Sequence, residues 1–145
     1  MDASVGFGEA RGMSGREAVI KSYRRNLEQF GPSFHYPHTQ TVEFLGEDEA
    51  VGTVTGHAKM AIDGKTFVTA IRYLDKYARE GGSWRFSDRR LWTLYVVPLD
   101  ELPTALGDKF QKRWPGTPPS PGDLPETLDS WKAFVSGIER SKGKK

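Results

Sequence analysis

The side chains best suited to chemistry are three histidines, because the chain contains no cysteine. His35 and His38 lie three residues apart in one strand-like segment, and His57 lies in the next. An imidazole titrates near neutral pH and accepts a proton from a carbon beside a carbonyl when a dry pocket holds it. We therefore expect His35 or His38 to act as a general base.

We predict neither a bound metal nor a cofactor. Without cysteine there is no thiol nucleophile, disulfide, thiolate metal ligand or iron–sulfur cluster. Successive side chains of a strand point to opposite faces, so His35 and His38 diverge unless a bulge at Pro37 intervenes. No carboxylate lies at a spacing that would complete a metal site. Nucleotide-binding and serine-hydrolase motifs are also absent.

Strict alternation places His38 on the apolar face of its strand, the side expected to line a pocket or core. That face also carries Phe34, Val42 and Phe44. His57 is expected to point outward. The alternative is that either candidate histidine is a half-buried residue whose ring is hydrogen-bonded to the backbone.

Arg89 and Arg90 are adjacent on a strand, so one of them points inward. An inward guanidinium could hold a substrate oxygen or stabilise an oxyanion. We favour the other interpretation, an ion pair with Asp75 or Asp88 across strands.

Aromatic residues share this sheet, and Tyr73 and Trp92 are the candidates for substrate contacts. Such side chains otherwise belong to the core.

Residues 34–99 have the period-two pattern of long strands, expected over 34–45, 50–62, 65–79 and 83–98. Asp63-Gly64 and Gly81-Gly82 are turn pairs that accept positive φ. Because such short turns join only antiparallel neighbours, we predict a four-stranded meander.

A helix precedes the strands. Ser14 and Glu17 form a capping box at its start, and Gly31 suits the left-handed position after its end. One short strand, residues 4–7, is expected before this helix.

We divide the chain into a domain over residues 1–102, a proline- and glycine-rich region over 103–125, and an amphipathic helix with a basic tail over 126–145. The net charge of +2 argues against nucleic-acid binding. No apolar stretch is long enough to span a membrane, and no signal peptide is evident. We expect a cytoplasmic protein.

Three segments carry a family resemblance: Gly15–Ile20, the histidine strand Phe34–Phe44 with the loop after it, and Arg72–Leu91 with its Gly-Gly turn. Together they resemble the SnoaL-like branch of the nuclear transport factor 2-like superfamily, from about Asp2 to Leu102. The resemblance implies an α+β fold in which a curved antiparallel sheet wraps around helices to form a cone with an apolar pocket. Members usually begin with one or two further helices, which we expect to be missing here. Either the start is truncated, or the C-terminal helix around Trp131 takes their place.

The family includes polyketide cyclases, dehydratases, isomerases and a dehydrochlorinase, alongside binding proteins. Counting along the resemblance places the dehydrochlorinase-type base at His35 and favours Arg89 over Arg90. The resemblance therefore implies a cofactor-free lyase, isomerase or cyclase for a small apolar molecule. The alternative is a ligand-binding or dimerisation module without chemistry. We also expect a homodimer, because the strands carry apolar residues on both faces.

Overall fold

The computed structural model describes residues 3–7, 10–123, 126 and 128–142. In chain order the elements are β1 (Ser4–Phe7), β2 (Ala10–Ser14), α1 (Arg16–Gln29), β3 (Phe30–Phe44), β4 (Glu49–Ile62), β5 (Lys65–Glu80), β6 (Ser83–Pro98), η1 (Leu99–Glu101), α2 (Leu102–Ala105) and α3 (Asp129–Lys142). None of the described helices is long and apolar enough to cross a membrane.

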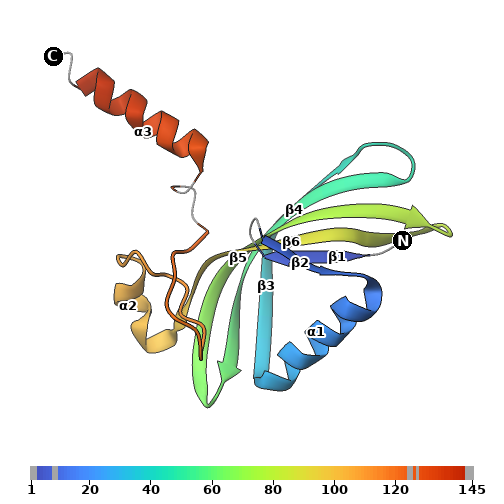
Figure 1. The fold of residues 1–145 in the computed structure, drawn as a ribbon, viewed down its shortest axis with the longest axis horizontal. Helices are drawn as coiled ribbons and strands as arrows, with labels where there is room; N and C mark the ends of the chain where they lie inside the picture. The colour runs from blue at the N-terminus through green and yellow to red at the C-terminus, as the bar shows by residue number, and fades with distance from the viewer. Residues whose placement is uncertain (1–2, 8–9, 124–125, 127, 143–145) are drawn as a thin grey trace.

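The strands form one curved, mixed sheet in the order β2-β1-β6-β5-β4-β3. Strands β3 to β6 are the predicted antiparallel meander, and α1 lies against the concave side of the sheet (Figure 1). Strand β1 extends the sheet by pairing parallel to β6, and β2 pairs antiparallel to β1. The α+β class is confirmed, while β2 was not anticipated.

The two short turns of the meander have the expected backbone. Asp63 and Gly64 have φ of 49° and 74°, and Gly81 and Gly82 have φ of 55° and 79°. Two consecutive residues with positive φ give a turn whose twist matches that of the flanking strands. The first turn sets the register of the whole β4–β5 ladder, and the second sets that of the β5–β6 ladder as far as its first bulge.

The predicted capping box at the start of α1 is wrong. Ser14 pairs with Ser4 at the end of the β1–β2 ladder, so it belongs to a strand. Gly15 caps the helix instead, at φ 90° and without a side-chain hydrogen bond. Its carbonyl accepts the first helical bond, from the Val19 amide at 3.0 Å. A non-local strand pairing has displaced the local cap.

The predicted left-handed ending of α1 is also wrong. Phe30 already has extended backbone, with φ −98° and ψ 134°, and the chain passes directly from α1 into β3. Gly31 serves close packing, because a Cβ at that position would lie 3.1 Å from the Cβ of Ala61.

Period-two alternation and the strand register define two faces of the sheet. We call the side toward α1 the concave face and the other the outer face. At the end of the sheet near the Asp63-Gly64 turn, both are covered. The concave cluster contains Ala58, Met60, Ile62, Phe67 and Val96, packed by Phe30 and Trp114. The outer cluster contains Val68, Val97 and Ala105, packed by Tyr95 and Leu102.

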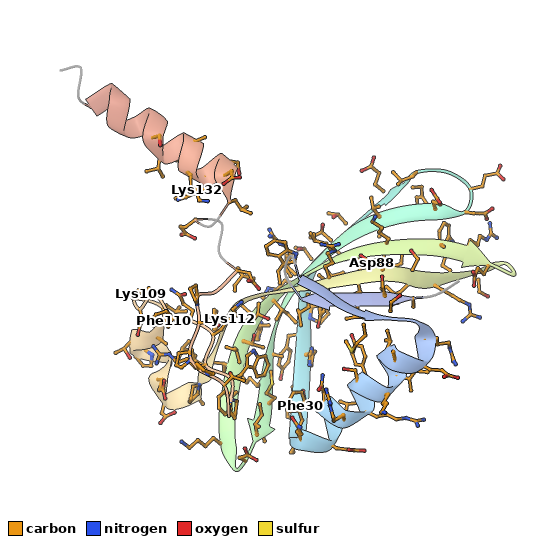
Figure 2. All side chains as sticks on the ribbon, viewed as in Figure 1. Phe30, Asp88, Lys109, Phe110, Lys112 and Lys132 are labelled. Carbon is orange, nitrogen blue, oxygen red and sulfur yellow. The ribbon has the colours of Figure 1, made fainter. Side chains whose placement is uncertain are left out.

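The segment after α2 lies beside β6 and bridges to it in parallel at Lys112, which is labelled in Figure 2. The Val96 amide donates to the Gln111 carbonyl at 2.9 Å, and the Arg113 amide donates to the Val96 carbonyl at 2.8 Å. Lys112 in turn bridges to Ser120. The stretch is thus hydrogen-bonded to the sheet, and the division of the chain into three parts stays a prediction.

Helix α3 stands away from the sheet (Figure 1). The rings of Trp131 and Phe134 contact each other, with centroids 5.6 Å apart. Both side chains remain exposed, so these two rings do not pack on the rest of the described chain.

A substitution at Gly52 tests how tightly the curved strands pack. A Cβ there would lie 2.7 Å from the Thr41 carbonyl oxygen and 3.0 Å from the Tyr77 ring. We expect Gly52→Ala to lower the free energy of unfolding by about 1–3 kcal/mol, measured by urea denaturation. Gly46→Ala is the matched control, because a Cβ there meets nothing within 4 Å. Equal stability of the two variants would contradict this packing.

Candidate functional site

A β-bulge in β3 decides where the histidines point. Pro37 pairs with Gly56, but the next pair is Thr39 with Thr55, so His38 is an extra residue in its strand. Strict alternation, used to place His38, therefore fails at this position. His35 precedes the bulge and takes the concave face with its partner Ala58. Val42 and Phe44 follow the bulge and also take the concave face, while Phe34 does not.

His38 lies on the outer face and contacts His57 there. Its Nε2 is 2.5 Å from His57 Nδ1, a hydrogen bond between two imidazoles. The ring of Tyr36 stacks on His57, with centroids 4.9 Å apart and planes at 20°. His57 thus points outward as expected, whereas His38 is separated by the sheet from the concave site.

His35 makes no described side-chain hydrogen bond within residues 3–7, 10–123, 126 and 128–142, and its side chain is exposed. It lies three same-face positions along β3 from Val42. The row of paired residues that starts at Val42 crosses the sheet through Gly52 and Asp75 to Arg89. No described contact joins His35 directly to Arg89.

The best-defined polar group of the concave face is an ion pair in its middle. Asp75 is 2% exposed and pairs across strands with Arg89. Arg89 Nε donates to Asp75 Oδ1 at 2.7 Å and Nη2 donates to Oδ2 at 2.8 Å. The Tyr77 hydroxyl donates to Oδ2 at 3.0 Å. The ion pair favoured from the sequence is present, and Arg90 points the other way toward Asp88, at 3.8 Å.

Two aromatic rings hold the guanidinium of Arg89. Its central carbon lies 4.3 Å from the ring centroid of Tyr73 and 4.2 Å from that of Phe86. Cation–π contacts and two charge-assisted hydrogen bonds together fix its orientation. Arg89 is therefore a preorganised group on the concave face.

These surroundings alter three pKa values. Burial raises the pKa of Tyr73, although nearby Arg89 opposes the change. Burial and the hydrogen bond to Asp75 raise the pKa of Tyr77. Burial alone would lower the pKa of Arg89, but the hydrogen bonds and charge of Asp75 outweigh it and raise that pKa. At neutral pH the site presents a paired cation and two neutral phenols.

Beyond this ion pair the concave face is aromatic and open. Phe44 contacts Trp84 edge to face, with centroids 5.6 Å apart, and Phe86 contacts Tyr77 at 5.1 Å. Phe44 is 67% exposed and Phe86 is 48% exposed. An uncovered aromatic wall around a small polar group is a typical surface for a mostly apolar ligand.

Trp92, a predicted substrate contact, lies on the outer face. It pairs with Arg72, whose guanidinium carbon lies 5.5 Å from the Trp92 ring centroid. Tyr73, the other candidate, lies beside Arg89. The sequence analysis had placed Phe44 on the side expected to line the pocket. It did not choose Tyr77 as a candidate, although the alternation of Tyr77 with Asp75 was a usable signal.

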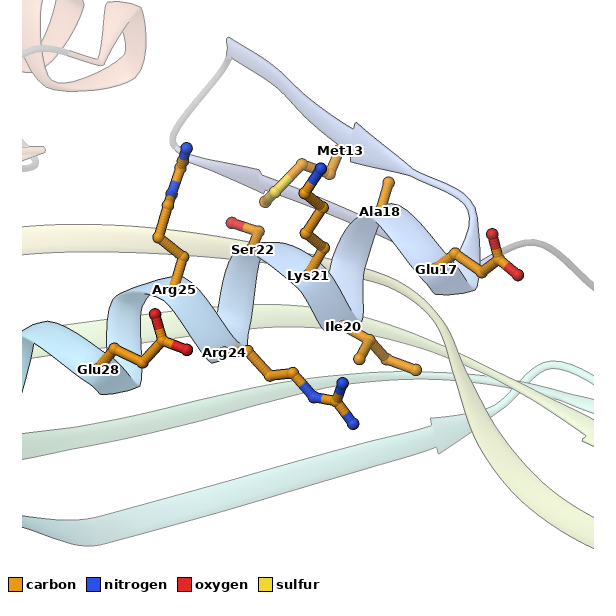
Figure 3. Close-up of a pocket in the computed structure, with 9 residues that line it drawn as sticks. All are labelled: Met13, Glu17, Ala18, Ile20, Lys21, Ser22, Arg24, Arg25 and Glu28. Atoms are coloured by element: carbon orange, nitrogen blue, oxygen red, sulfur yellow. The ribbon is translucent and has the colours of Figure 1, made fainter.

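A separate groove of about 850 Å³ runs along the outward side of α1 (Figure 3). Its lining includes Met13, Ala18 and Ser22, with Glu17, Lys21 and Arg25 around them. None of the residues predicted as catalytic or substrate-binding lines it. The groove is therefore distinct from the concave site.

Replacing Asp75 tests the role of the ion pair. Asp75→Asn leaves the partly buried Arg89 cation without a counter-charge, so we expect the free energy of unfolding to fall by about 3 kcal/mol. Denaturant titration of the variant measures the loss. Arg90→Ala is the control, since its weak, exposed pair should cost less than about 1 kcal/mol. If the two losses are similar, Asp75 does not organise this face.

Solved structures share the fold. LinA is 25% identical, with a TM-score of 0.62, and the match covers 68% of this chain and 69% of that one. A hexachlorocyclohexane dehydrochlorinase, LinA-type3 from Novosphingobium barchaimii, is 21% identical, with a TM-score of 0.61 over 68% of this chain and 69% of its own. A candidate scytalone dehydratase from Novosphingobium aromaticivorans is 22% identical, with a TM-score of 0.60 over 66% of each chain.

A search of curated proteins gave no match. The model of the SnoaL-like domain family matches residues 1–90, which include the histidine strand and the Asp75–Arg89 pair. Enzymes are among the structural neighbours, and small-molecule binding is typical of the fold. The chain belongs to the SnoaL-like domain family of the nuclear transport factor 2-like superfamily.

Proposed function

We propose that the concave face binds a small, mostly apolar molecule and that His35 abstracts a proton from it without a cofactor. The reaction class is that of a lyase, isomerase or cyclase acting on an activated C–H bond. One observation carries this proposal: the bulge in β3 leaves His35 as the histidine on the same face as the Arg89 ion pair. His38 and Trp92 lie on the outer face and take no part.

Arg89 would orient the substrate. Asp75 accepts hydrogen bonds from Nε and Nη2, so Nη1 remains to donate to a carbonyl or hydroxyl oxygen. The neutral phenol of Tyr73, whose pKa burial raises, is a second donor beside it. Because Asp75 neutralises Arg89, the site favours an uncharged ligand over an anion.

The chemical step follows from these roles. His35 takes the proton, and the electron pair of the C–H bond forms a new double bond to the adjacent carbon, which carries the leaving group or belongs to a carbonyl. The negative charge that develops on a carbonyl oxygen is stabilised by the Arg89 donor. Departure of a leaving group, ring closure or reprotonation at another carbon then gives a lyase, cyclase or isomerase outcome.

The second candidate is ligand binding without catalysis. The observation in its favour is that the described residues supply no carboxylate hydrogen-bonded to His35 and no contact between His35 and Arg89. A base without an orienting partner is less well held for proton transfer.

A ligand screen followed by one substitution separates the two candidates. We expect an uncharged cyclic compound with an acidic C–H to raise the melting temperature, because a ligand bound only by the folded state stabilises it. His35→Gln should abolish turnover of that compound while its binding persists, since the amide is polar but not basic. His38→Gln is the matched control and should retain activity.

Full activity of His35→Gln would exclude His35 as the base. Binding without turnover in the unmodified protein would favour the second candidate. Unfolding of His35→Gln, seen by circular dichroism, would identify His35 as a structural residue.

We also propose a homodimer formed through the outer face of β3, β4 and β5, the face that also carries His38 and His57. Phe34, Tyr36 and Leu74 are exposed on that face, and a second copy would cover them. Light scattering at micromolar concentration should therefore give twice the chain mass. Phe34→Glu should yield the monomer, whereas Phe44→Glu, on the concave face, should remain dimeric. A monomeric unmodified protein would contradict this assignment.

A further inference from the structure

We propose that His38 and His57 form a two-imidazole site that binds a divalent transition-metal ion, such as Cu²⁺, Ni²⁺ or Zn²⁺. The site lies on the outer face, where the bulge of β3 brings His38 against its neighbour on β4. It is independent of the concave site, since the sheet separates the two. It also differs from the His35–His38 pair considered from sequence, whose members point to opposite faces.

The geometry suits a shared ion. His38 Nε2 and His57 Nδ1 are 2.5 Å apart, so these two ring nitrogens face each other. Metal–imidazole distances of about 2.0–2.1 Å place two ligating nitrogens about 3 Å apart. A small rotation of each ring, with the donor ring's proton moved to its other nitrogen, would open the hydrogen bond and admit an ion between the two rings.

The two rings are already held near this arrangement. Tyr36 stacks on His57 and limits the rotation of its ring. On the other side, the hydroxyls of Thr39 and Thr55 are 2.6 Å apart and link the same two strands just past the bulge. Neighbouring strands thus present the two imidazoles in a fixed register, which lowers the entropy lost when an ion binds.

In a single chain the surroundings predict an open, exchangeable site, and the proposed dimer would cover part of the same face. The described residues contain no cluster of three or more histidine, cysteine or carboxylate side chains, so water would complete the coordination. Lys59 and Arg72 flank the pair on the same face and oppose a bound cation. Two imidazoles without thiolate or carboxylate should prefer Cu²⁺ over Ni²⁺ and Zn²⁺, following the usual order of divalent affinities.

An ion at this site would link β3 to β4 at the bulge. Strand β3 is the edge of the sheet and its side chains are exposed along nearly its whole length. A ligand that binds only the folded protein stabilises it by mass action. Metal binding should therefore raise the melting temperature and protect the amides of β3 from hydrogen exchange.

The test uses full-length protein without an affinity tag, treated with a chelator and then titrated calorimetrically with CuCl₂, NiCl₂ or ZnCl₂ at one neutral pH. We expect saturable binding of one ion per chain and a higher melting temperature. His38→Gln and His57→Gln should each abolish both effects. His35→Gln is the matched control and should retain both, because His35 lies on the opposite face.

Saturable binding that survives both His38→Gln and His57→Gln would place the ion elsewhere and overturn the proposal. The absence of saturable binding by the unmodified protein for all three ions would also overturn it. If His57→Gln does not fold, His38→Gln decides the matter, because His38 is an exposed, extra residue in its strand.

Discussion

The face on which a strand side chain lies is fixed by its position in the pleat, and one inserted residue reverses that assignment for everything beyond it. In β3 the inserted residue is His38. Its insertion places His35 toward α1 and, further along, returns Val42 and Phe44 to the same concave face. It also turns His38 toward His57 on the outer face. Both proposed sites depend on this single irregularity of the ladder.

The Asp75–Arg89 pair organises the other side of the concave face. A buried carboxylate is costly unless it is paired and hydrogen-bonded, and Asp75 accepts from Arg89 twice and from Tyr77 once. The same contacts orient the guanidinium between two rings. The Arg89 guanidinium is thus held in one orientation among aromatic side chains, and its Nη1 remains to donate to a ligand.

The meander could be predicted because its information is local: alternating side chains and turn pairs that accept positive φ. The same alternation required one of Arg89 and Arg90 to point inward. The family resemblance selected Arg89, and the sequence left its partner open between Asp75 and Asp88. The ends of α1 could not be predicted, because Ser14 is drawn into a ladder with Ser4, a partner distant from the helix. The face of His38 and its contact with His57 depend on the register between two strands, which periodicity does not specify.

The most direct measurement is a ¹H–¹⁵N correlation spectrum of the three imidazole rings, recorded with and without a ligand from the screen. If the concave face is the binding site, the ligand should shift the ring signals of His35 and leave those of His38 and His57 in place. Shifts confined to His38 and His57, or no shift of any ring at saturation, would contradict the assignment of His35 to the site.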